Sequence, residues 1–364
     1  MKKRKKGGTE MTLTQKKPKI EIPVDEINRR MTLFDEIIIG HPRMNTIAKR
    51  TMLLKRETES RIVQNNARKE KVRGRPIKAL ELWVLPIIGP TGSTKSYSMW
   101  KVVEEINSDP AVPDGEIPVL MVTLRNVRSV KDFHLAILEL YDDGATDELD
   151  QNPVHNPVLA NAAIAKIARR KKTSLIVIDE AHNILAYDAG KRGKQMAIAL
   201  KSLVNEGVFS IILMGTERTK DLFKYDPELH SRCVVDGGVM LDAFDVSKEN
   251  DRIYFFKFVK RLEERMLADG IIDEPIGLTS SAEDRAKVFD LAGGVVGMVG
   301  KFLRSALRVA LDSGRTTIVW SDIQNVFQAW NAMSSEKAFD PFDNGPQKKT
   351  LAYVTVPDKK KATT

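Results

Sequence analysis

The residues best suited to chemistry form a run of glycine, hydroxyl-bearing and basic residues. In order they are Gly89, Pro90, Thr91, Gly92, Ser93, Thr94, Lys95 and Ser96. In the pattern G-x-x-x-x-G-K-[ST], backbone amides surround phosphates, the lysine neutralises the β- and γ-phosphates, and the last hydroxyl ligates Mg²⁺. Lys95 and Ser96 are predicted to have these two roles. Thr94 departs from the pattern, which has glycine there, so loop flexibility and nucleotide affinity stay open.

A pair of acidic residues follows an apolar run further along the chain. The run is Leu175 to Ile178, and Asp179 and Glu180 come directly after it. In phosphate-loop enzymes the first acid holds Mg²⁺ through water and the second polarises the attacking water. Either acid alone could instead cap the next helix. The two motifs in this order favour hydrolysis of ATP, with ATP and Mg²⁺ as cofactors.

Two further residues could complete the reaction. Thr216 follows the apolar run that ends at Met214, where a hydroxyl could reach the attacking water or the γ-phosphate. Arg232 comes sixteen residues later, after a short predicted helix. An arginine from a neighbouring subunit can stabilise the charge that develops in the transition state. A solvated surface arginine is the alternative.

These side chains need a scaffold that brings strand ends together. Continuous apolar runs predict buried parallel strands, and amphipathic runs between them predict helices. Strands are expected at 80–88, 117–124, 174–178 and 208–214, with 317–330 as a fifth strand or a turn plus helix. Helices are expected at 129–141, 158–170 and 194–205. The alternation predicts an α/β fold with a parallel five-stranded sheet, the AAA+ type of P-loop ATPase.

The chain divides into five predicted parts. Residues 77–245 are expected to form the ATPase core, and the helical pattern beyond it a small all-helical lid domain at 246–333. The remaining parts are a disordered basic tail at 1–22, a helical basic region at 23–76 and a flexible tail at 334–364. In the last of these, Phe339 and Phe342 could dock in a partner's groove, or the segment could be a plain chain end.

Composition excludes several classes of protein. With 42% hydrophobic and 29% charged residues the chain reads as soluble and globular. Its longest apolar run, 82–88, is far shorter than the roughly 20 residues that span a bilayer. Cys233 is the single cysteine and the five histidines lack metal-ligand spacing. We therefore expect neither a disulfide framework nor structural zinc, and a cytoplasmic location.

Positive charge is concentrated near the N-terminus. Residues 1–75 contain 21 Lys and Arg against 9 Asp and Glu, whereas the whole chain has a net charge of +9. Such a region could neutralise nucleic-acid phosphates, or it could be a solubilising tail. Within it, Arg73 to Pro76 matches the core of a minor-groove hook, although a short basic linker explains the same residues.

The sequence resembles the TniB/TnsC transposition ATPases, relatives of MuB-type target-capture proteins. The match is carried by IDEAHNIL at 178–185, LKSLVNE at 200–206, MGTE at 214–217 and DPELHSR at 226–232. The resemblance implies ATP-driven assembly of a homo-oligomer, as rings or helical filaments, on double-stranded DNA. It also implies recruitment of a transposase and a link to a target-selection protein of the TniQ/TnsD type.

The same resemblance suggests where DNA could bind. The family places residues after the second strand toward a central pore, and here these are Arg125, Arg128 and Lys131. A solvated helix start is the alternative for all three. The lid segment lacks the arginine that many AAA+ proteins carry near the nucleotide. Lys301 or Arg304 could substitute, and the sequence leaves that role unassigned.

Two rival functions share the same nucleotide residues. A helicase loader or initiator would bind a replicative helicase or carry an additional winged-helix domain, for which the residues after 335 leave little room. A signalling switch would bind nucleotide and rarely hydrolyse it; Thr94 favours this reading, whereas Glu180 and Arg232 oppose it. Images of the protein with duplex DNA and a slowly hydrolysed ATP analogue are expected to separate assembly from switching.

Overall fold

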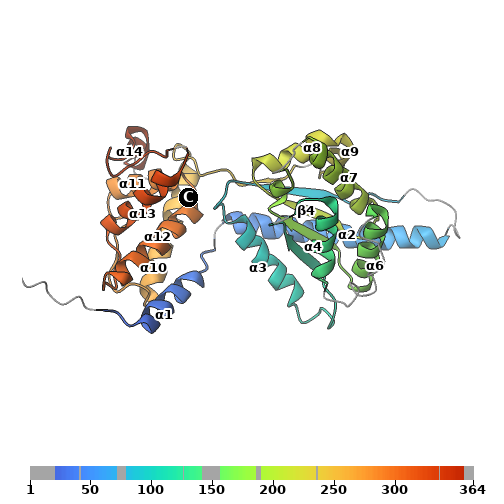
Figure 1. Ribbon diagram of the computed structural model, residues 1–364, viewed down its shortest axis with the longest axis horizontal. Helices are drawn as coiled ribbons and strands as arrows, with labels where there is room; N and C mark the ends of the chain where they lie inside the picture. Colours follow the sequence, from blue (N-terminus) through green and yellow to red (C-terminus); the bar gives the residue numbers. More distant parts are fainter. Residues whose placement is uncertain are drawn as a thin grey trace, which may run out of the picture.

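The computed structural model describes residues 21–40, 42–71, 79–125, 127–141, 156–185, 190–234, 237–335 and 337–355. Within this part an α/β domain and a helical domain lie side by side, joined by extended segments (Figure 1). The minor-groove hook at 73–76 and residues 1–20 of the expected disordered tail lie outside the described residues.

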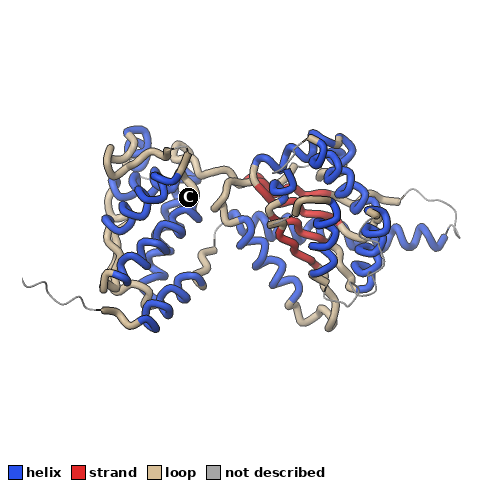
Figure 2. Tube along the Cα trace, viewed as in Figure 1, coloured by secondary structure: helices blue, strands red, loops and turns tan. Residues whose placement is uncertain are grey.

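The α/β domain is built on a parallel sheet of five strands (Figure 2). Its strands are β1 Val84–Ile88, β2 Val119–Thr123, β3 Leu175–Asp179, β4 Ser210–Gly215 and β5 Val239–Met240, in the order β2-β3-β4-β1-β5. The predicted parallel five-stranded sheet is confirmed. The fifth strand, however, is β5, while residues 320–333 form helix α13, whose buried Ile323 and Phe327 recur at helical spacing.

Helices cover both faces of this sheet. Those of the α/β domain are α2 Pro42–Lys71, α3 Lys95–Asn107, α4 Val130–Glu139, α6 Pro157–Arg170, α7 Lys191–Asn205, α8 Asp221–Tyr225 and α9 Pro227–Ser231, with short 3₁₀ helices η2 Ala181–Leu185 and η3 Glu217–Lys220. Strand residues alternate between the two faces. In β3, Val177 packs with the cluster under α2 and α3, whereas Ile176 and Ile178 pack with the cluster under α4, α6 and α7.

The helical domain has its own core. It contains α10 Glu249–Ala268, α11 Ala282–Ala292, α12 Val296–Asp312, α13 Trp320–Met333 and α14 Lys348–Val354. Helix α12 contributes a continuous buried stripe that includes Val299, Phe302 and Leu303. Interlocked aromatic rings, among them Phe302 against Phe327 with centroids 5.5 Å apart, fill the centre.

The two N-terminal helices belong to different domains. Helix α1 Val24–Asp35 packs on the helical domain through Met31 and Phe34. The next helix, α2, lies under the sheet, where Ile47 and Leu54 are buried among sheet and α3 residues. Figure 1 shows α1 beside α10 and α12, and α2 behind the sheet. The chain between them therefore crosses from one domain to the other.

Part of the segment expected to be a flexible tail packs on the helical domain. The Phe342 ring meets Trp320 and Phe327 at centroid distances of 6.1 Å each. On α14, the Thr350 hydroxyl donates to Asp290 Oδ1 at 2.6 Å. Burial of these apolar rings outweighs the cost of ordering the segment, because the facing α13 surface is itself aromatic. Phe342 is thus packed within its own chain, while Phe339 is 39% exposed.

Candidate nucleotide site

The loop after β1 has the backbone geometry of a phosphate cradle. The Gly89 amide donates to Gly215 O at 3.0 Å, which ties the loop to the end of β4. A Cβ on Gly89 would lie 2.9 Å from Leu241 O, so only glycine fits. Thr94 has φ 64° and ψ 9°, in the left-handed region. The position therefore favours glycine on backbone grounds, and threonine holds it under strain.

Lys95 is buried beneath this loop. The residue is 4% exposed, and its Nζ donates to Pro90 O at 3.3 Å. Burial lowers the pKa of Lys95, while the charges of Glu180 and Asp179 act in the opposite direction. The nearby Ser93 hydroxyl is buried and, among the described residues, has no hydrogen-bond partner. A buried ammonium and an unsatisfied hydroxyl beside the loop backbone fit a bound phosphate chain.

Asp179 and Ser96 come together at the start of α3. Asp179 is 3% exposed, and burial raises its pKa, although a hydrogen bond with Ser96 acts in the opposite direction. The amide of Glu180 donates to Asp179 Oδ1 at 2.8 Å. A carboxylate and a hydroxyl are the oxygen ligands that Mg²⁺ prefers beside phosphates, so this pair fits the predicted metal.

His182, to which the sequence patterns assign no role, lies between Glu180 and Thr216. Glu180 Oε2 lies 3.3 Å from His182 Nε2. On the other side of the ring, the Thr216 amide donates to His182 Nδ1 at 3.5 Å. His182 stands within IDEAHNIL, so a histidine two residues after the second acid was the available signal.

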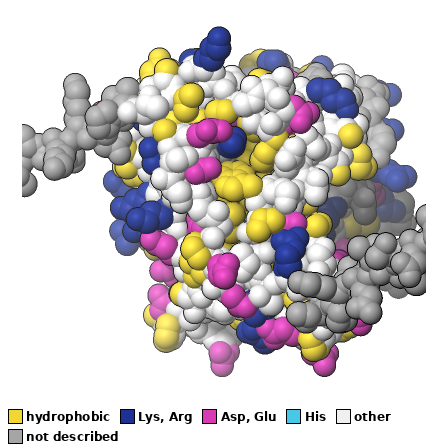
Figure 3. All heavy atoms as spheres, turned by 90° about the vertical axis from the view of Figure 1, so that its left-hand side faces the viewer, with side chains coloured by type: hydrophobic (Ala, Val, Ile, Leu, Met, Phe, Trp, Pro, Cys, Tyr) yellow, Lys and Arg dark blue, Asp and Glu magenta, His cyan; other side chains and the backbone are white. Residues whose placement is uncertain are grey.

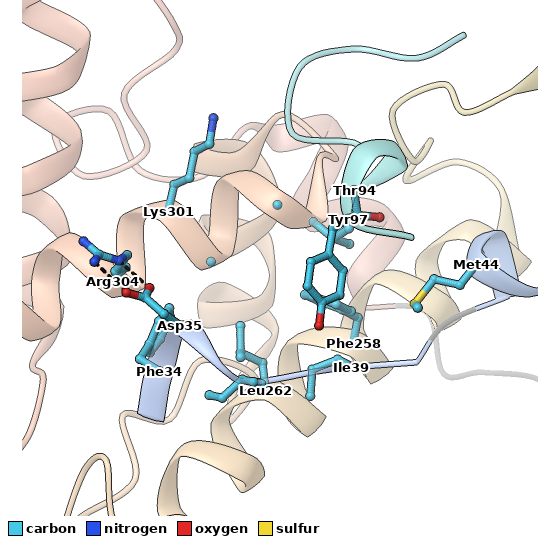
Figure 4. A pocket seen from close by; sticks show the side chains of 14 residues that line it. Phe34, Asp35, Ile39, Met44, Thr94, Tyr97, Phe258, Leu262, Lys301 and Arg304 are labelled. Atoms are coloured by element: carbon cyan, nitrogen blue, oxygen red, sulfur yellow. Dashed lines mark hydrogen bonds and ion pairs between the residues drawn. The ribbon is translucent and has the colours of Figure 1, made fainter. Parts of the chain in front are cut away.

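Two cavities that share Tyr97 flank the loop. One, of about 550 Å³, contains both acids and is lined by Ser96, Tyr97, Trp100, Met121, Thr123, Arg125, Asp179, Glu180 and Asn183. The other, of about 380 Å³, lies between the loop, α1 and the helical domain. In Figure 4 Tyr97 extends into it toward Phe258 and Ile39. The acidic cavity suits the γ-phosphate end of a nucleotide, and the mostly apolar one suits its base.

The helical domain contacts the loop directly. The Gly297 amide donates to Gly92 O at 3.1 Å, and a Cβ on Gly297 would overlap that carbonyl. Arg304 is engaged elsewhere, since it forms a two-pronged ion pair with Asp35 of α1 at 2.6 and 2.7 Å (Figure 4). Lys301 lines the apolar cavity, and its charge lowers the pKa of Lys95. Of the two candidate lid cations, Arg304 is thus held by α1, and Lys301 lines the cavity beside the loop.

Arg232 lies away from these residues. Its Nη1 is 3.0 Å from Glu81 Oε1, and its carbonyl accepts from the Val84 amide at 2.8 Å. Val84 begins β1, whereas the phosphate loop follows the last residue of that strand. At about 3.3 Å per residue, roughly 13 Å separates the two ends. Arg232 is thus not assembled with Lys95 and Glu180 of the same chain.

The three residues considered for DNA contact do not share one surface pocket. Arg125 lines the acidic cavity beside Glu180. Lys131 instead lines a separate cavity of about 990 Å³ between α4, α6 and α7. Between them in sequence, the Arg128 amide donates to Asp132 Oδ2 at 2.9 Å. Arg125 is therefore placed to influence the nucleotide as well as any polyanion.

Comparisons with known proteins agree with this geometry. Residues 84–223 match the family model described as an AAA domain. The ORC2 protein of Aeropyrum pernix, in ADPNP–ADP complexes, superposes with a TM-score of 0.53 at 15% identity, over 84% of this chain and 72% of that one. The ORC1 protein of the same organism, in complex with DNA, gives 0.53 at 13% identity, over 83% and 69%. No curated protein sequence matches significantly.

At identities this low, the superpositions show a shared fold alone. The region that matches the AAA domain model spans β1, the phosphate loop, both acids and Thr216. Among the described residues, no helix has the length and apolar character needed to cross a bilayer. The chain has the AAA+ P-loop NTPase fold, with a helical domain placed against its phosphate loop.

Proposed function

We propose that the chain hydrolyses ATP with Mg²⁺ and that it does so as a homo-oligomer. Bound Mg²⁺ would neutralise phosphate charge, and Ser96 and Asp179 are the residues that would hold it. Lys95 binds the β- and γ-phosphates through its ammonium. Glu180 orients the attacking water and accepts its proton, with Thr216 at the adjoining strand end.

The position of Arg232 carries the oligomer part of the proposal. A cation that stabilises the transition state must reach the γ-phosphate, and in one chain Arg232 is at the opposite end of β1. A second copy placed against the acidic cavity can supply it. The exposed rings of Tyr97 and Trp100 beside that cavity, 37% and 49% exposed, suit burial by such a neighbour.

The proposed role is regulation of transposition on double-stranded DNA. It rests on the sequence resemblance to TniB/TnsC proteins, with a transposase and a TniQ/TnsD-like target-selection protein as partners. On the helical-domain face drawn in Figure 3, visible acidic and basic side chains are mixed around an apolar centre. We assign DNA contact to the ATPase domain, where Lys131 lies in the first turn of α4 and Arg128 just before that helix.

An initiator-type ATPase is the second candidate. The structural likeness to two Aeropyrum pernix ORC proteins, one of them solved with DNA, favours it. An initiator and a transposition regulator would share the whole nucleotide site. They differ in partner, since the former acts with a replicative helicase and the latter with a transposase.

The decisive experiment images the protein with duplex DNA and a slowly hydrolysed ATP analogue. Rings or filaments that need both analogue and DNA are the expected result, and Glu180→Gln with ATP should give the same assemblies with a longer lifetime. A protein that stays monomeric under these conditions contradicts the proposal. Co-sedimentation of the assemblies with a transposase or a replicative helicase, each added alone, then separates the two roles.

A further inference from the structure

Residues immediately after the second acid form a tight turn whose side chains converge. Glu180 has φ 57°, and this left-handed residue turns the chain from β3 into η2. Asn183 anchors the turn, because its Nδ2 donates to Leu124 O at 2.8 Å just beyond β2. The turn brings the Glu180 carboxylate to 3.3 Å from the His182 ring, which is 17% exposed.

The contacts of the two ring nitrogens favour one tautomer of His182. The Thr216 amide donates to Nδ1, so Nδ1 must present its lone pair. The ring proton of the neutral imidazole is then on Nε2, the atom facing Glu180 Oε2. Burial lowers the pKa of His182, against the influence of Glu180, and so supports the neutral ring. One imidazole accordingly accepts from the β4 end and turns its protonated Nε2 toward the Glu180 carboxylate, 3.3 Å away.

Packing holds the ring in this orientation. Gly215, the last residue of β4, lies against it: a Cβ there would be 3.1 Å from His182 Nδ1 and 3.3 Å from the His182 amide. Gly215 O also accepts from the first amide of the phosphate loop, that of Gly89. The imidazole is thus wedged between the β3 and β4 ends, at a place where β4 is bonded to the loop itself.

We propose that His182 is a positioning residue for ATP hydrolysis, which holds one oxygen of Glu180 and couples it to the strand end carrying Thr216. The other carboxylate oxygen stays available to the attacking water. This inference rests on the proposed ATPase function and adds the route by which β4 sets the position of the base.

Replacing His182 by glutamine or by asparagine tests its contact with Glu180 and its contact with Thr216 separately. In His182→Gln, the side-chain nitrogen can occupy the Nε2 position and donate to Glu180. In His182→Asn, which is one methylene shorter, the oxygen can occupy the Nδ1 position and accept from Thr216 but cannot reach Glu180. His182→Ala removes both. Steady-state ATP turnover and binding of a slowly hydrolysed analogue are measured for all three, with thermal melting as the folding control.

The expected result is a split between turnover and binding. His182→Ala and His182→Asn should lower kcat by about 100-fold, because a displacement of about 1 Å at a reacting group costs that much. His182→Gln should retain kcat within about tenfold, and KM and analogue affinity should stay near wild type in all three.

Other outcomes have separate meanings. His182→Asn turning over as fast as His182→Gln, or a raised KM with unchanged kcat, overturns the inference while leaving the ATPase proposal intact. A wild-type protein without turnover on DNA overturns the ATPase proposal itself. If His182→Ala fails to fold, the Gln and Asn pair still decides.

Discussion

The two ends of β1 differ in how complete their chemistry is. At the carboxyl end, the loop, Lys95 and the two acids are assembled within one chain, with Lys95 and Asp179 buried. At the amino end, Arg232 is 19% exposed and paired with the half-exposed Glu81. A parallel sheet brings all its carboxyl ends to one edge, so a single chain can build the phosphate-binding half there. The amino ends lie at the opposite edge. A residue there, such as Arg232, can therefore act only on a nucleotide bound by another copy of the chain.

In our proposal, this difference places the nucleotide at the interface between two copies of the chain. The carboxyl end binds it and the amino end of a neighbour completes the reaction. Changes at the first end should therefore act on isolated chains, whereas changes at the second should appear only in assemblies. Four predictions test or refine this contrast.

Lys95→Ala is expected to have the broadest effect, on both nucleotide binding and assembly, since it removes the cation of the assembled end. Truncating a buried charge that meets an opposite charge costs about 2–5 kcal/mol, so ATP affinity should fall by at least roughly 30-fold. Assembly on DNA should disappear with it. Titration with a fluorescent ATP analogue and electron microscopy measure both, and Lys101→Ala, on the same helix and paired with Glu104, is the matched control. ATP-dependent assembly at wild-type level in Lys95→Ala would refute the nucleotide switch.

Arg232→Ala should leave ATP binding by isolated chains unchanged and lower turnover in assemblies by about 10³-fold, the scale of an arginine supplied by a neighbour. Mixing it with Glu180→Gln should restore some activity, because an interface with one intact Glu180 and one intact Arg232 can form. Arg308→Ala, another ion-paired surface arginine, is the control. No recovery in mixtures shown to co-assemble would mean that Arg232 acts within its own chain or not at this site.

The three basic residues after β2 should divide according to their positions. Arg128→Ala and Lys131→Ala should each lower the slope of log affinity for duplex DNA against log salt by about 0.9, for every sequence alike. Arg125→Ala should change ATP turnover more than the slope, because Arg125 borders the acidic cavity. Filter binding at several salt concentrations checks this. Equal slope losses at all three positions would instead place them together on DNA.

The smallest effect is expected from Thr94→Gly. A threonine in the left-handed region destabilises the folded state by about 1–2 kcal/mol. Glycine removes this strain, but part of the gain is offset because glycine also raises the conformational entropy of the unfolded chain. The free energy of unfolding in urea should therefore rise by about 1 kcal/mol or less. Lys172→Gly, at another positive φ outside the nucleotide site, is the control and should stabilise similarly. A Thr94→Gly protein less stable than wild type would show that the threonine side chain supports the loop.

In the N-terminal region, local sequence patterns predict the helices but not the surfaces on which they pack. Helical spacing is enough to predict a helical region at 23–76, because amphipathic periodicity is a property of adjacent turns. The partner of each apolar face lies far away in sequence. That Phe34 packs on the helical domain and Ile47 under the sheet followed from which complementary surface each helix met on folding.

The phosphate loop, the acid pair and the parallel sheet that presents them could be predicted from the sequence alone. These depend on glycine positions, buried apolar runs and strand-to-helix order, which are read along the chain. The sequence does not predict strand β5, because a strand of two residues is too short to show a periodic pattern.

The remaining features of the site depend on tertiary packing. It placed His182 between Glu180 and Thr216, set Arg232 against Glu81, and packed Phe342 into its own domain. Each depends on surfaces brought together across dozens of residues or from separate strand ends. A local pattern specifies which way a side chain leaves its own helix or strand, and the packing of distant elements decides what it meets.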